Sequence, residues 1–281
     1  MEDRLQLSRL ELKYTIREEV ALQVREFVRS YLEIDEYGAT RPNLSYPVHS
    51  LYLDSDDLVL YWNTINGNKN RYKLRLRFYE SRSSAPVYFE IKRRMNNAIL
   101  KQRGGVRREA VDWILGGHLP EPTHLLSNDP KQLAALQRFS QLLNQHHCKP
   151  KAHIVYQREA WISPHNNSVR LTMDRDVMCD PDPTTRLATS LLNPVCVFGK
   201  SVILELKFTG RFPDWFGELV RIFNLVQGPA AKYADGVALC GENKFSPAWQ
   251  HLPDREAIEQ ARLRKEMLQK RCAGVLIPNS R

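Results

Sequence analysis

Cationic and apolar side chains alternate along the stretch NRYKLRLRFYE, residues 70–80. Arg71, Lys73, Arg75 and Arg77 take every second position, and apolar or aromatic residues lie between them. Alternation with a period of two predicts a β-strand whose two faces differ in character. One face is suited to a hydrophobic core, whereas the other places positive charges in a row without an acid.

Charged side chains also gather on one face of other predicted strands, in LELKY, VYFEIKRR, LKQRG, HIVYQRE, VRLTMD and VILELKF. The polar faces of these segments carry Glu11, Lys13, Glu90, Lys92, Arg94, Lys101, Arg103, Tyr156, Arg158, Arg170, Thr172, Asp174, Glu205 and Lys207. A polar strand face is usually just solvated, but here cations outnumber acids, and like charges on neighbouring strands repel. A closed barrel with these faces inside would tolerate the repelling cations only if a polyanion occupied its interior.

The whole pattern predicts strands with a few helices between them. Strands are predicted near residues 8–16, 47–54, 71–80, 86–94, 99–107, 151–162, 168–177 and 201–208. Helices are predicted near residues 17–32, 56–65, 130–146, 213–226 and 254–272. Strands joined by mostly short loops indicate an α+β protein with a mainly antiparallel sheet. We therefore expect an antiparallel closed β-barrel of about eight strands that forms a tunnel, with helices packed outside.

The length of 281 residues suits one large domain or two small ones. We expect residues 1–250 to form one domain and residues 251–281 to add a peripheral C-terminal helix. There is no run of about 18 apolar residues and no apolar signal-peptide core. Five cysteines without a CxxC pair argue against a secreted disulfide scaffold. The expected compartment is the cytoplasm.

The formal net charge of +9 points to an anionic partner, such as nucleic acid, an acidic membrane surface or a phosphorylated small molecule. An interior lined by arginine and lysine suits a linear chain of phosphates, because arginine forks bind phosphate oxygens bidentately and lysine adds compact charges. The carboxylates among these cations suit Mg²⁺ or Mn²⁺, which bridge phosphate oxygens.

The set LELKY, YKLRLRFYE, YFEIKRR, VYQREAW, VRLTMD, VILELKF and GPAAKYADGV resembles the VTC domain over roughly residues 8–240. This is the catalytic domain of the vacuolar transporter chaperone complex, a polyphosphate polymerase among the triphosphate tunnel metalloenzymes. The resemblance implies an antiparallel tunnel barrel, in agreement with the strand pattern. It also implies a free-standing catalytic domain without the regulatory and membrane regions of the fungal complex.

The resemblance implies a role for each matching residue. The phosphate-binding set that it implies is Lys13, Arg75, Arg77, Lys92, Arg158, Arg170 and Lys232. Tyr156 matches a tyrosine that contacts phosphates, Glu205 matches the metal-binding glutamate, and Lys101 and Arg103 fall where the family has further tunnel cations. Strand facing and the wider superfamily add Glu11, which would share the metal, and Glu90, Asp174 and Lys207.

Two positions depart from the pattern. The wider superfamily often begins with Glu-x-Glu-x-Lys, but here Arg9 stands at the first glutamate, which favours the polymerase over related triphosphatases and cyclases. The family often has Ser-Lys near its C-terminal motif, whereas this chain has Ala231 before Lys232, so one hydroxyl contact to phosphate is lost.

The resemblance thus implies transfer of the terminal phosphoryl group of ATP to phosphate or a growing polyphosphate chain, with Mn²⁺ or Mg²⁺. Arg75, Arg77, Arg158 and Arg170 would hold the triphosphate and stabilise charge in the transition state. Lys13, Lys92, Lys101, Arg103, Tyr156, Lys207 and Lys232 would bind the substrate or product chain. ATP and polyphosphate are the expected partners, together with a possible membrane protein for product export.

Three alternatives remain open on the sequence. An inorganic triphosphatase would use nearly the same residues with water as the acceptor. A polyphosphate-binding sensor without catalysis fits the change at Ala231. A nucleic-acid-binding protein would use the basic surplus and aromatic residues, but no familiar binding motif is present and Glu90 and Glu205 would repel the backbone. We therefore expect no nucleic acid as partner.

Overall fold

The computed structural model describes residues 9–96, 98–164, 168–246 and 255–272. Residues 1–8, 247–254 and 273–281, which include the ends of the two predicted domains, lie outside the described residues. The long strands are β1 (Arg9–Ile16), β3 (Ser45–Asp54), β4 (Asn70–Phe78), β5 (Val87–Met95), β6 (Ala98–Val106), β7 (Lys149–Ile162), β8 (Val169–Pro181) and β10 (Val202–Thr209). Each of them matches a predicted strand within a few residues.

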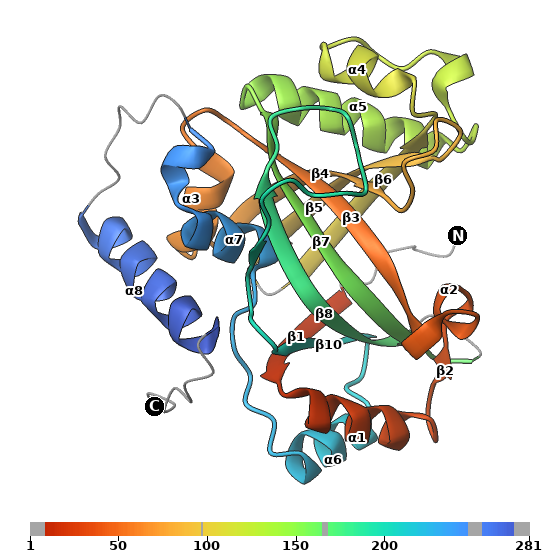
Figure 1. Cartoon of the computed structure of the whole chain (residues 1–281). Helices are drawn as coiled ribbons and strands as arrows, with labels where there is room; N and C mark the ends of the chain where they lie inside the picture. Colours follow the sequence, from red (N-terminus) through yellow and green to blue (C-terminus); the bar gives the residue numbers. More distant parts are fainter. Residues whose placement is uncertain (1–8, 97, 165–167, 247–254, 273–281) are drawn as a thin grey trace.

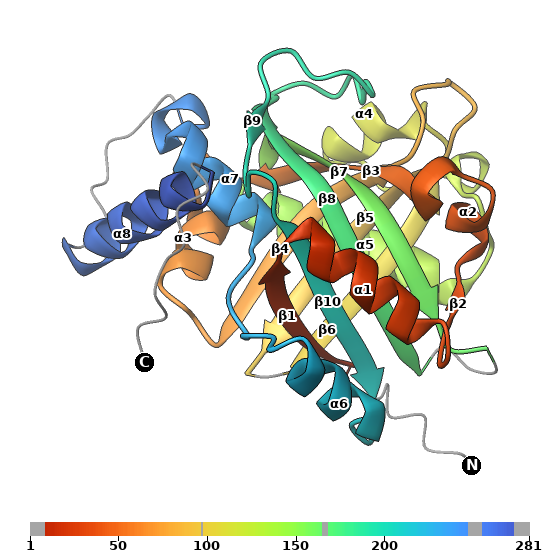
Figure 2. The same cartoon turned by 60° about the horizontal axis from the view of Figure 1, so that its bottom comes forward.

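The long strands pair in the order β7-β3-β4-β5-β6-β1-β10-β8, and β8 pairs again with β7. Every pairing in the described part of the chain is antiparallel. The weakest seam is between β1 and β6, where Arg9 and Ile99 are the paired residues, so hydrogen bonding does not close the wall along its full length. The predicted α+β fold with an antiparallel tunnel-like sheet is confirmed (Figures 1 and 2).

Alternation along the strands sends apolar side chains outward under the helices. On β4 and β5, Leu74, Leu76 and Phe89 are buried against α5 (Pro130–Gln145), which contributes Leu136 and Phe139. On the other side, α1 (Glu18–Val28) and α6 (Asp214–Ile222) cover β1, β8 and β10 (Figure 2). Burying each of these side chains stabilises the folded state by about 1.5–3 kcal/mol. The polar inner face makes no such hydrophobic contribution.

Helix α7 (Lys232–Cys240) covers one end of the barrel beside α3 (Val59–Ile65) and α8 (Arg255–Cys272) (Figure 1). The buried Asp54 carboxylate accepts from the backbone N–H groups of Leu60 and Tyr61 and from the Tyr233 hydroxyl, all at 2.8 Å. This carboxylate therefore ties α7 to β3 and the start of α3. Gly236 permits the close approach, because a Cβ there would lie 2.8 Å from Cys179 Sγ on β8.

Helix α7 was not predicted, although it begins within the motif GPAAKYADGV. Nearly every residue of α7 is buried, so the helix has no polar face to give a 3.6-residue pattern. The short helices α2 (Glu36–Ala39) and α4 (Ala110–Leu115) and the two-residue strands β2 (Glu33–Ile34) and β9 (Val195–Cys196) were also not predicted. Among the described residues, the structure contains no helix with the length and apolar character required to cross a membrane.

Candidate active site inside the barrel

The inner face of the barrel carries the charged residues that the strand pattern placed together. Antiparallel register aligns them in rows across neighbouring strands. Lys73, Lys92 and Lys101 lie directly opposite one another on β4, β5 and β6. The next row toward the far end of β4 places Glu90 between Arg75 and Arg103.

Strands β4, β5 and β6 form the first wall of the barrel, and Glu90 is its anionic centre. Its carboxylate lies 2.7 Å from both the Arg75 guanidinium and the Lys101 ammonium, 3.7 Å from Arg103 and 3.8 Å from Arg77. Burial alone would raise the pKa of Glu90, but the nearby cations, chiefly Arg77 and Arg75, hold it well below its usual range. The carboxylate therefore stays ionised and fixes the guanidinium groups in place.

Glu205 is the centre of the second wall, which β1, β8 and β10 form with the start of α7. Its carboxylate pairs with Lys207, lies 3.0 Å from Lys232 and 3.3 Å from Lys13, and lies 3.8 Å from Arg158. Burial would raise the pKa of Glu205, but these cations lower it well below its usual range. The family resemblance implies a metal-binding role for Glu205, and the structure places its carboxylate among lysines.

Arg158 and Lys232 meet at a second buried acid, Asp174. The Arg158 guanidinium donates two parallel hydrogen bonds of 2.7 Å to the Asp174 carboxylate, the bidentate geometry of strong arginine pairs. Lys232 Nζ lies 2.8 Å from the same carboxylate. Both cations also lie over the Tyr156 ring, 5.1 Å and 5.0 Å from its centroid. The structure thus brings together three of the residues expected to bind substrate, Tyr156, Arg158 and Lys232.

Glu11 joins the two walls across the weak β1/β6 seam. Its carboxylate lies 3.0 Å from Lys92 on β5 and 3.3 Å from Lys13 on its own strand. Lys13 Nζ also donates to the Ala230 carbonyl at 2.9 Å, which anchors the segment leading into α7. Burial opposes ionisation of Glu11, but Lys92 and Lys13 lower its pKa strongly. An ion pair therefore bridges a seam that has few backbone hydrogen bonds.

Three polar residues of β3 complete the site and were not predicted. Arg75 donates to the Tyr52 hydroxyl at 2.9 Å, and Arg77 donates to Ser50 Oγ at 3.3 Å and to the Tyr156 hydroxyl at 3.0 Å. Tyr46 lies on the same face as Ser50 and Tyr52, at alternate positions of SYPVHSLYLD. The sequence of β3 therefore does show alternation with a period of two, but its inner face lacks the charges that marked the other strands.

Arg170 is placed differently from the other predicted arginines. It shares a strand face with Asp174, but its guanidinium lies 3.2 Å from Asp35, the residue before α2. Asp35 is buried and also accepts from the Tyr46 hydroxyl at 2.7 Å. Arg170 therefore lies toward the end of the barrel away from α7, and Asp35 is a contact that the sequence analysis missed.

Lys73 lies inside the barrel, opposite Lys92. Within the described part of the chain, no carboxylate forms an ion pair with it. Burial, Lys13 and Lys92 lower its pKa well below the usual value. A lysine in this position gains a favourable partner when an anion enters, because the bound anion replaces like-charge repulsion with attraction.

A divalent cation would find two of the predicted ligands near each other, because Glu11 and Glu205 both lie 3.3 Å from Lys13 Nζ. Asp174 and Glu205 likewise share Lys232. The described residues contain no group of three or more acidic, histidine or cysteine side chains with metal-binding geometry. Carboxylate oxygens suit Mg²⁺ or Mn²⁺, so these acids fit a metal whose remaining ligands are phosphate oxygens and water.

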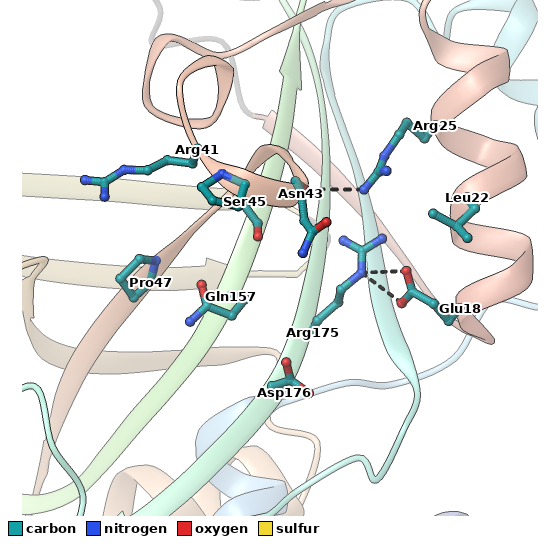
Figure 3. A pocket seen from close by; sticks show the side chains of 11 residues that line it. Glu18, Leu22, Arg25, Arg41, Asn43, Ser45, Pro47, Gln157, Arg175 and Asp176 are labelled. Carbon is teal, nitrogen blue, oxygen red and sulfur yellow. Dashed lines mark hydrogen bonds and ion pairs between the residues drawn. The ribbon is translucent and has the colours of Figure 1, made fainter.

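Two surface clefts lie beyond the lumen. A cleft of about 510 Å³ between α1 and the outer side of β7 and β8 contains Arg25 and Arg175 (Figure 3). Both are already paired, Arg175 with Glu18 and Glu159, and Arg25 with Glu159, at 2.8–2.9 Å. A second cleft, of about 550 Å³, contains Lys69, Arg71, Arg94, Gly67 and Asn96 and has no acidic lining residue. It marks a cationic mouth at the start of β4, and we call it the basic mouth.

The inner charges predict a pH dependence of anion binding. Burial lowers the pKa of Lys207 to about 8, although the Glu205 charge opposes this effect. A bound triphosphate favours the charged lysine, so its affinity should fall about tenfold through this group between pH 7 and pH 9. Isothermal titration with inorganic triphosphate measures the fall. The contribution of Lys207 to this fall should be absent in Lys207→Arg, because the arginine stays charged at both pH values. An equal fall in both proteins would contradict the role of Lys207 in the pH dependence.

Comparison with known proteins places this arrangement in a family. The sequence model of the VTC domain matches residues 8–240. A search of curated proteins found no significant match. A candidate adenylate cyclase from Bacillus halodurans superposes with a TM-score of 0.45 at 17% identity, covering 80% of this chain and 94% of that chain. A Pyrococcus horikoshii protein gives 0.40 at 12% identity, covering 81% and 96%.

Proposed function

Because this chain belongs to the VTC domain family, a family of triphosphate-tunnel enzymes, we propose that it is a polyphosphate polymerase. It transfers the terminal phosphoryl group of ATP to phosphate or to a growing polyphosphate chain, and ADP leaves. The observation that carries the proposal is the continuous cationic lining of the barrel. Lysines and arginines on both walls outnumber the four inner acids Glu11, Glu90, Asp174 and Glu205, so the interior favours an elongated polyanion.

Each group of inner residues supports one part of the reaction. Arg75 and Arg77, held by Glu90, and Arg158, held by Asp174, present rigid guanidinium groups to the triphosphate. Rigid donors stabilise the charge that spreads over the equatorial phosphoryl oxygens in the transition state. No general base is required, since the acceptor phosphate is already an anion. When bound by Glu205 and Glu11, Mn²⁺ or Mg²⁺ would neutralise phosphate charge.

The lysine row Lys73–Lys92–Lys101 favours a polymerase over a triphosphatase. A triphosphatase needs cations for three phosphates and a path for water. Here a row of lysines continues from the arginines toward the basic mouth, where Arg71 faces Arg94 across β4 and β5. This extra length of cationic wall suits an acceptor chain longer than one triphosphate.

The test is a product analysis with the purified full chain. Incubation with ATP and Mn²⁺ is expected to give ADP and long chains that a polyphosphate stain reveals on a gel. Free phosphate without chains would replace the proposal by an inorganic triphosphatase. Tight polyphosphate binding without turnover would replace it by a non-catalytic sensor.

A further inference from the structure

Tyrosine side chains gather at the end of the barrel away from α7. Tyr37 on α2, Tyr46 at the start of β3, Tyr79 just after β4 and Tyr88 at the start of β5 follow one another around this end. Their ring centroids are separated by 5.8 Å, 6.5 Å and 6.4 Å in that order. We call this set the tyrosine rim. Figures 1 and 2 show α2 and the start of β3 on the opposite side of the barrel from α7.

The tyrosine rim lies directly beside the arginines assigned to the triphosphate. Tyr88 is the cross-strand partner of Arg77, and the Arg103 guanidinium lies over the Tyr88 ring, 3.4 Å from its centroid. Gly105 lies opposite Tyr88 on β6, and a Cβ there would come within 3.1 Å of the Tyr88 ring. The glycine thus keeps room for an aromatic ring on the inner face.

Hydrophobic burial alone does not account for the tyrosine rim. Tyr46 is buried and uses its hydroxyl on Asp35, which is a structural role. Tyr37, in contrast, is 63% exposed, and Tyr79 and Tyr88 are half-buried. Accessible aromatic faces beside a phosphate site are the arrangement that stacks a nucleobase. The basic mouth is lined instead by Gly67, Lys69, Arg71, Arg94 and Asn96, none of which is aromatic.

We propose that the tyrosine rim is the nucleobase subsite of the tunnel, where the base of ATP stacks on Tyr79 beside the exposed Tyr37 ring, while Tyr88 meets Tyr79 edge-on and carries Arg103 on its face. This inference rests on the proposed function, because it takes ATP as the substrate. It orients the nucleotide, with its base at the tyrosine rim and its terminal phosphate toward the lysine row. The acceptor chain then occupies the side of the basic mouth. Stacking of this kind is tolerant of base identity, since every base offers a π-face.

The test compares two ligands that differ by the nucleoside alone. Dissociation constants for ATP and inorganic triphosphate are measured by isothermal titration on the unmodified chain and on Tyr37→Ala, Tyr79→Ala and Tyr79→Phe. The alanine variants are expected to weaken ATP binding about 5- to 100-fold and to leave triphosphate binding unchanged. Tyr79→Phe should bind both ligands as the unmodified chain does. Tyr31→Ala, which removes a partly exposed tyrosine on the far side of the wall beside Trp215, is the matched control.

Equal loss of both ligands in the alanine variants, or no loss of either, would overturn the nucleobase subsite. These outcomes are distinct from failure of the proposed function, which the product gel reports. A chain that binds ATP through the tyrosine rim but makes no polyphosphate would keep this inference and lose the polymerase. If Tyr79→Ala does not fold, Tyr37→Ala decides the matter, because Tyr37 is an exposed residue on a short helix.

Discussion

Arg75→Ala is expected to lower kcat/KM for ATP by about 10²–10³-fold while the chain remains folded. The Arg75 guanidinium is fixed by two groups, Glu90 at 2.7 Å and the Tyr52 hydroxyl at 2.9 Å. It is therefore already positioned to stabilise the charge of the transition state and need not reorganise during the reaction. Folding should tolerate the change because Glu90 keeps Lys101 and Arg77 as partners. Steady-state kinetics and thermal unfolding measure the two effects.

Two further variants make the interpretation of Arg75→Ala specific. Arg75→Lys keeps the charge but loses the planar fork, so it should recover binding of triphosphate more than it recovers kcat. Arg82→Ala removes an exposed arginine paired with Glu80 in the loop after β4 and should leave the kinetics unchanged. A kcat/KM for Arg75→Ala within threefold of the unmodified chain would remove Arg75 from the site.

Glu205→Gln is expected to abolish the gain in activity from Mn²⁺ and also to destabilise the fold by about 3 kcal/mol. The structural reason is that Glu205 contacts Lys13, Lys207, Lys232 and Arg158, which would lose a buried anionic partner. Because cations depress the pKa of Glu205, its stabilising effect is present above the carboxylate's unfolded pKa and is lost as pH falls. The stability difference from the unmodified chain should therefore shrink under acidic conditions.

The metal role of Glu205 is separable from its role in stability. Triphosphate binding is measured with Mn²⁺ and with EDTA, and the gain in affinity from Mn²⁺ should disappear in Glu205→Gln. Asp56→Asn is the matched control, because Asp56 also pairs with two lysines, Lys149 and Lys151, but is itself partly exposed. Its effect on stability should stay below about 1 kcal/mol. An undiminished Mn²⁺ gain in Glu205→Gln would assign the metal to other ligands.

The sequence by itself determined which charged side chains of the long strands line the barrel. A β-strand has a period of two, so Arg75 and Arg77 had to share a face, as did Glu205 with Lys207. These faces are charged and the opposite faces are apolar. A closed barrel with the charged faces inside, around an anion, and the apolar faces covered by helices is therefore more favourable than an open sheet. For that reason the predicted long strands agree with the structure, and alternation alone predicts the charged inner residues of these strands.

The tertiary structure decided which charges meet. Register places Glu90 between Arg75 and Arg103, while the fold brings Glu205 to Lys232, 27 residues away. It also set α7 over one end of the barrel and the tyrosine rim around the other. These features depend on contacts between distant segments, and local periodicity carries no information on such contacts. A helix buried on all sides, like α7, leaves no amphipathic pattern to predict from. Neutral inner residues, like Tyr52, alternate along their strand but lack the charges that marked the other strands.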